Sequence, residues 1–117
     1  MRAPTYFTLA ALLDGPLHGY AIIKRAEQLS EGSVRMTAGT LYGALDRLSR
    51  EGLVVEEGQE IVAGRARRYY RLTDEGHAAL EVEAERMSKA AAVVQKPEGV
   101  AASTARRRPV KARPRLA

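Results

Sequence analysis

The sequence has 117 residues, a formal net charge of +5 and no cysteine. This length favours one small domain with a modest core, which a second subunit would enlarge. The absence of cysteine excludes disulfides and thiolate metal sites. No run approaches the roughly 20 apolar residues of a membrane span, so we expect a cytoplasmic protein with no membrane partner.

The positive charge is concentrated at one end of the sequence. Residues 1–95 hold 12 Lys/Arg and 13 Asp/Glu, whereas residues 96–117 hold seven Lys/Arg and one acid. The second segment also has three prolines and no apolar periodicity, which predicts a disordered basic tail. This tail either holds DNA phosphates or only improves solubility. For residues 1–95, an argument for nucleic-acid binding must therefore depend on where the arginines lie.

Residues 4–13 and 18–30 predict two helices separated by strong turn residues. Pro4 suits the first turn of the earlier helix. That helix is apolar nearly all round, which indicates burial on more than one side. We therefore expect a second subunit to contact it, with Leu9 and Leu12 in the interface.

Residues 37–53 predict a third helix with an unusual outer face. Four apolar residues repeat at the spacing of one buried stripe: Leu41, Ala44, Leu45 and Leu48. Thr37 suits the N-cap, and Gly52 suits the residue that follows the helix. The opposite face carries Gly39, Gly43, Asp46 and Arg50, beside Tyr42 and Arg47. Glycines allow close approach, and a helix N-terminus attracts phosphate, so a helix-turn-helix that reads DNA is favoured. The alternatives are an ordinary solvated face and, for Tyr42, a core position.

After Gly52 the sequence predicts two short strands, 53–57 and 67–72, joined by a loop too long for a tight hairpin. Alternation places Tyr70 and Leu72 inward and Tyr69 on the other face. Residues 64–71 contain four arginines and no acid: Arg65, Arg67, Arg68 and Arg71. This run favours a DNA-binding wing, and a solvated edge protected by charge is the alternative.

Residues 74–95 predict a fourth helix, capped by Thr73 or Asp74. Its apolar residues repeat at alternating spacings of four and three: Leu80, Ala84, Met87, Ala91 and Val94. About two heptads of such a seam favour pairing with the same helix of a second subunit. Packing within its own domain is the competing interpretation.

Five segments in register resemble the PadR family of bacterial transcriptional regulators. They are GPLHGY (15–20), GTLY (39–42), LDRL (45–48), EGL (51–53) and GRARRYYRLT (64–73). The resemblance implies a mainly α fold with a small β-hairpin: a winged helix-turn-helix at residues 1–73 and a C-terminal dimerisation helix at 74–95. It further implies a homodimeric repressor that a small molecule at the dimer interface releases from DNA. Ala66 stands where the family often has proline. Residues 73–94 contain no Trp, Tyr or Phe, so nothing in this helix identifies an effector.

The predicted partner is double-stranded DNA, and ten residues form the predicted site: Tyr20, Thr37, Gly39, Thr40, Tyr42, Arg47, Arg50, Arg65, Arg67 and Arg68. Arg47 is predicted to read base edges, and the other polar residues to hold phosphates or the minor groove. A winged-helix module that binds protein is the alternative, favoured if the arginines lie among Glu56, Glu57 and Glu60. With two histidines (His18 and His77) and no phosphate loop, we expect no enzyme activity, cofactor or metal.

Overall fold

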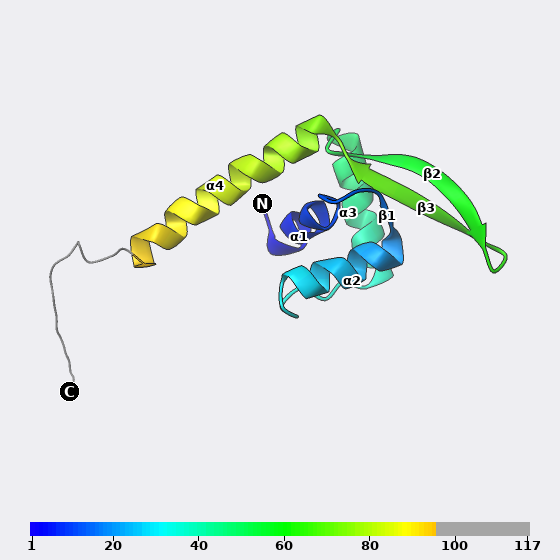
Figure 1. The fold of residues 1–117 in the computed structure, drawn as a ribbon, viewed down its shortest axis with the longest axis horizontal. Helices are drawn as coiled ribbons and strands as arrows, with labels where there is room; N and C mark the ends of the chain where they lie inside the picture. The colour runs from blue at the N-terminus through cyan, green and yellow to red at the C-terminus, as the bar shows by residue number, and fades with distance from the viewer. Residues whose placement is uncertain (96–117) are drawn as a thin grey trace, which may run out of the picture. The chain divides into compact units, whose positions relative to one another are not determined.

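The computed structural model describes residues 1–95, which form four helices and a three-stranded sheet (Figure 1). In chain order the elements are α1 (Ala3–Ala11), β1 (Leu17–His18), α2 (Gly19–Leu29), α3 (Ala38–Arg50), β2 (Val54–Val62), β3 (Arg65–Leu72) and α4 (Asp74–Gln95). The predicted mainly α fold with a small hairpin is therefore confirmed. The predicted tail, residues 96–117, lies outside the described residues.

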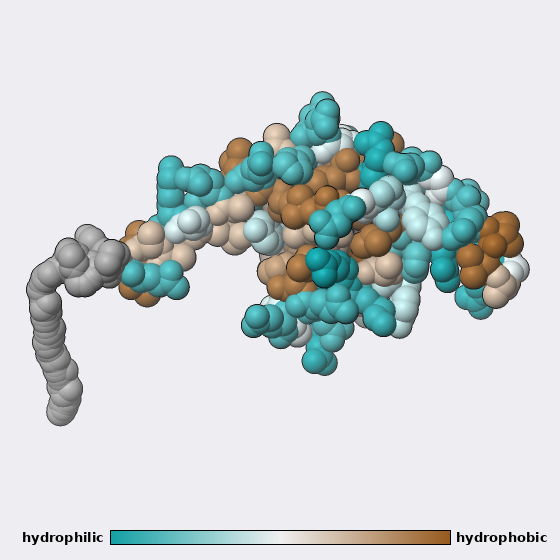
Figure 2. Space-filling view, in the orientation of Figure 1, coloured by the Kyte–Doolittle hydropathy of each residue, from teal (hydrophilic) through white to brown (hydrophobic). Residues whose placement is uncertain are grey.

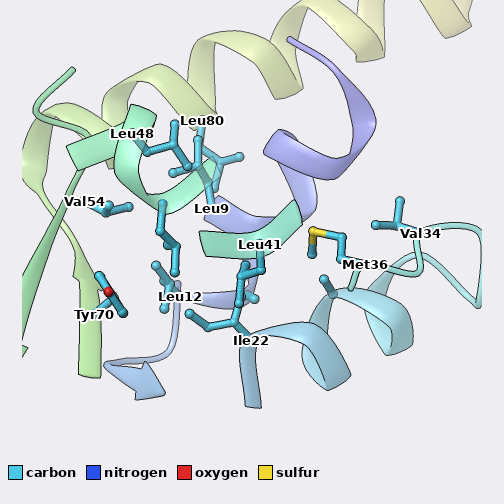
Figure 3. Close-up of a cluster of buried hydrophobic side chains, with 13 residues drawn as sticks. Leu9, Leu12, Ile22, Val34, Met36, Leu41, Leu48, Val54, Tyr70 and Leu80 are labelled. Atoms are coloured by element: carbon cyan, nitrogen blue, oxygen red, sulfur yellow. The ribbon is translucent and has the colours of Figure 1, made fainter. Parts of the chain in front are cut away.

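One apolar cluster holds α1, α2, α3 and the sheet together (Figure 3). Its most buried members are Leu9, Leu12, Ile22, Leu41, Leu45, Leu48 and Val54. Burying each large side chain contributes about 1.5–3 kcal/mol to folding. Leu9 and Leu12 are 0% and 2% exposed, so the expectation that they face a second subunit is wrong. The apolar periodicity of α1 indicates that these two leucines are buried, but it does not indicate whether their own chain or a second subunit covers them.

The helix-turn-helix is defined at both helix starts by side-chain caps. His18 Nδ1 accepts the Ala21 N–H at 3.4 Å before α2. Thr37 Oγ1 accepts the Thr40 N–H at 3.1 Å before α3, as its N-cap position predicted. Gly52, at φ 77°, then ends α3 as predicted. Local chemistry thus fixes where each helix begins and where α3 ends.

The sheet has the antiparallel order β1-β3-β2, and its hairpin is longer than predicted. The predicted loop at 58–66 is wrong, because β2 continues to Val62 and β3 begins at Arg65. Ala63 and Gly64 have φ of 52° and 79°, as a two-residue turn between twisted strands requires. Gly58, which resembles a loop residue in the sequence, lies within β2 at a shift in the strand register between Glu56 and Gly58.

Helix α4 begins against the sheet. Thr73 Oγ1 accepts the Gly76 N–H at 2.9 Å, so the predicted Thr73 cap is present. A Cβ at Gly76 would lie 2.0 Å from the Leu53 carbonyl oxygen, so only glycine fits this approach. Leu80, assigned to a dimer seam from the sequence, is 5% exposed within this chain's own core. Two compact units divide the chain, Met1–Glu83 and a second that begins at Ala84, so α4 contributes to both.

Within the described residues, no helix is long and apolar enough to cross a membrane.

Candidate nucleic-acid interface

The outer face of α3 is open at two glycines. Gly39 and Gly43 are exposed, and a Cβ built on either would meet nothing within 4 Å. Neither has the positive φ that would require glycine. Glycine costs roughly 1 kcal/mol relative to alanine inside a helix. The fold itself therefore does not explain why this face lacks side chains, and an external body that approaches the backbone would explain it.

Tyr42 borders the open face and joins it to α2. Its side chain is 43% exposed, and a Cβ at Gly19 would lie 2.2 Å from the Tyr42 hydroxyl oxygen. The phenol therefore rests on the first residue of α2, where a larger side chain would displace it. Tyr42 is neither a core residue nor free in solvent, and it connects the starts of the two helices.

A groove runs between α3 and the hairpin within the unit Met1–Glu83. It is lined by Tyr42, Gly43 and Asp46 from α3, and by Ala66, Arg68 and Tyr70 from β3. Hydrogen bonding to Tyr70, with Glu56 adding a smaller effect, raises the pKa of Arg68. Arg68 therefore places a positive charge in the same groove as Gly43 of α3.

The other hairpin arginines lie on the opposite face of the ribbon. Side chains alternate along β3, so Arg65 and Arg67 point away from the face that carries Arg68. Arg67 is opposite Glu60 in the register, and Glu60 also accepts the hydroxyl of Tyr69. This hydrogen bond raises the pKa of Tyr69.

Arg71 pairs with Glu57 at 2.9 Å. Acids of β2 therefore accompany part of the arginine run, and the hairpin is less uniformly basic than residues 64–71 suggested. Arg65 differs, since its partner across the strands is Val62.

Arg47 turns away from the groove. Its Nη2 donates to Thr5 Oγ1 of α1 at 2.8 Å. It lines a second pocket with Arg2, Thr40 and Ala44, so the structure does not bring it together with Tyr42 and Arg68. Arg50 is exposed three turns along α3 from Gly39, on the same side of the helix.

The start of α2 presents another aromatic side chain. Tyr20 is 66% exposed, and Lys24 Nζ lies 5.7 Å from the centre of its ring. The sequence interpretation missed Lys24, although its spacing of four residues from Tyr20 placed it on the same helix face. Thr40 is exposed near Thr37, whose hydroxyl is already engaged as the helix cap.

His18 is a further residue that the predicted site omitted. Its ring meets the edge of Tyr69 at 5.5 Å between centroids, since β1 pairs with β3 there. Burial, and then the charge of Arg67, lowers the pKa of His18. This favours the neutral ring that accepts the Ala21 N–H. Among residues 1–95, no group of His, Asp or Glu is arranged to hold a metal ion.

Two helices joined by a turn, followed by a hairpin beside the second helix, define a winged helix-turn-helix protein. The profile of the Transcriptional regulator PadR-like family matches residues 8–82. The chain therefore belongs to this family.

Relatives of known structure share the fold. A PadR family transcription regulator from Clostridium difficile R20291 is 27% identical, with a TM-score of 0.65 over 81% of this chain and 97% of that one. Bacillus subtilis PadR, solved in complex with operator DNA, is 23% identical, with a TM-score of 0.62 over 82% of this chain and 62% of that one. The latter likeness concerns the fold alone.

A curated transcriptional regulator of Mycobacterium tuberculosis (strain ATCC 25618 / H37Rv) is 46% identical over 67 residues. The match covers 57% of this chain and 59% of the relative. The chain thus spans less than two thirds of this relative's length.

Proposed function

We propose that this protein is a DNA-binding transcriptional regulator, acting in the cytoplasm as a repressor, and that it is not an enzyme. The observation that carries the proposal is the open glycine face of α3, beside Arg68 in one groove. Membership of the PadR-like family supports it. The protein-binding alternative draws on the acids of β2. The open face at positions 39 and 43 suits either kind of partner, and the cation Arg68 beside it favours DNA.

In this proposal α3 enters the major groove of double-stranded DNA. Gly39 and Gly43 allow the helix backbone to approach, and Thr37, Thr40, Tyr42 and Tyr20 hold phosphates around it. Arg68 lies at the groove beside α3, while Arg65 and Arg67 reach the flanking backbone or minor groove. Arg47 must exchange its bond to Thr5 for a contact with a base edge. Arg50 contacts DNA from the far end of the same face.

The hairpin arginines supply the first test. The natural protein is used to select duplexes from a random pool, and the selected duplex serves as the operator. Replacing both Arg65 and Arg67 with alanine should lower affinity for all sequences. It should also reduce the slope of log affinity against log salt by about 2 for each subunit, or about 4 for a homodimer. The control is Arg35→Ala, because Arg35 is not among the proposed contacts and pairs with Glu27 at 3.7 Å. A double variant with unchanged affinity and slope would remove the hairpin from the interface.

A homodimer would place two copies of α3 in successive major grooves. The half-sites of a pseudo-palindromic operator would then lie roughly 10 base pairs, or a multiple of this, apart. The proposed interface is the remaining seam of α4, formed by Ala84, Met87, Ala91 and Val94. Met87 and Val94 are 36% and 87% exposed, so an apolar surface is available for pairing.

Met87→Glu tests this seam by sedimentation. It should yield a monomer with lower operator affinity, because a carboxylate in a paired apolar seam is costly. Val93→Glu is the matched control, since Val93 is 77% exposed but lies beside the proposed seam. If Met87→Glu stays a dimer, the interface lies elsewhere.

We also propose that a small effector binds at the dimer interface and releases the operator.

A further inference from the structure

The end of the hairpin is apolar, although the rest of the hairpin is strongly polar. Ile61 is 71% exposed, and its neighbours Val62 and Ala63 leave an apolar patch at the turn (Figure 2). Ala63 adopts a left-handed φ of 52°, where glycine, asparagine or aspartate would be less strained. Polar turn residues would satisfy the fold at this position, so the fold does not account for an apolar turn.

The position of Ile61 connects this patch to the groove beside α3. Ile61 is paired with Ala66 across the strands, and paired side chains project from the same face of a sheet. Ala66 lines the groove that contains Tyr42 and Arg68. Ile61 therefore lies at the outer end of the candidate nucleic-acid interface, two residue pairs beyond Arg68 along the same face.

Two arginines of β3 lie next to the turn. Arg65 and Arg67 lie on the reverse face of the same two-stranded ribbon from Ile61. Arg67 has Glu60 opposite it, whereas Arg65 has the uncharged Val62 opposite it. A ribbon with an apolar edge on one face and guanidinium groups on the other matches the minor groove. There, the walls are deoxyribose carbons and the rims are phosphates.

We propose that Ile61, with Ala63 at the turn, forms an uncharged contact with the sugar walls of the minor groove beside each half-site. Arg65 and Arg67 neutralise the phosphates on its rims. This inference rests on the proposed function. The proposed contact carries no charge, so its strength should depend on the width of the minor groove. Operators with A·T-rich flanks, where this groove is narrow, should therefore be preferred.

The test compares Ile61→Thr with the natural protein on two duplexes, the selected operator and the same operator shortened to remove its flanks. Threonine keeps the β-branched shape that suits a strand, and exposure at position 61 leaves the core intact. Val55→Thr is the matched control, because Val55 is 37% exposed on the same strand but far from the turn. Affinity is measured by fluorescence anisotropy at several salt concentrations.

Ile61→Thr should bind the long operator about three- to tenfold more weakly, with an unchanged salt slope, because no charge is removed. On the short duplex the variant and the natural protein should bind equally. Equal binding to the long operator, or the same loss on both duplexes, would overturn the inference while the proposed function stands. A change in sedimentation without a change in DNA affinity would assign the patch to a protein contact and also overturn it. If the natural protein binds neither duplex, the proposed function fails as well.

Discussion

The two faces of α3 differ in what determines their residues. On the inner face, Leu41, Leu45 and Leu48 are at most 1% exposed, and each is held by the core of its own chain. On the outer face, Gly39 and Gly43 have no neighbour within reach of a Cβ. The inner face is thus explained by folding, whereas the outer face carries residues that weaken the helix. Within one helix, the residues that folding does not explain are the ones to examine for function.

Truncation on the inner face should have the largest effect. Leu45→Ala should lower the free energy of unfolding by about 2–5 kcal/mol, since a buried side chain is lost and a cavity remains. Urea unfolding of the full chain measures this. Leu13→Ala is the control, because Leu13 is 51% exposed and should change stability by less than about 0.5 kcal/mol. Similar losses in both variants would mean that the inner face of α3 is not the core described here.

A smaller effect is expected at His18, which caps the start of α2 next to the residue that Tyr42 of α3 contacts. The pKa of His18 is lowered from its usual value of about 6.5 by burial and by Arg67. The unfolded chain therefore binds more protons than the folded chain, and stability should decline as pH falls below about 6.5. The decline should level off once pH is below the folded pKa.

His18→Asn separates this effect from other titrations. Asparagine also caps helices but does not titrate, so this part of the pH dependence should disappear in urea unfolding measured between pH 5 and 8. His77→Asn is the control and should retain the decline, because His77 lies on α4 beside Glu81. Identical pH profiles for natural protein and His18→Asn would contradict a titrating cap.

Sequence reasoning recovered the elements whose signals are local. The Thr37 cap, the leucine spacing of α3 and Gly52 each act within a few residues, and the structure has α3 where they place it. The hairpin was predicted too short, because Gly58 resembles a loop residue when the register shift opposite it is unknown. Strand β1 has only two residues and no periodicity.

The arrangement of the candidate site was harder to predict, since it depends on contacts between distant residues. The bond from Arg47 to Thr5 spans 42 positions, and no pattern near Arg47 indicates it. Tyr42 likewise rests on Gly19, a residue of another helix. Leu9 and Leu12 show the same limit, because periodicity indicates burial but not which surface provides it.

The central claim is that the outer face of α3 is kept free of side chains for DNA, and Gly43→Leu tests it most directly. Leucine favours helix and meets open space at position 43, so the variant should be more stable by up to about 1 kcal/mol. Its affinity for the selected operator, measured by fluorescence anisotropy, should nevertheless fall at least about tenfold, because the side chain holds the helix away from the groove. A variant that is folded and binds the operator as tightly as the natural protein would contradict the account.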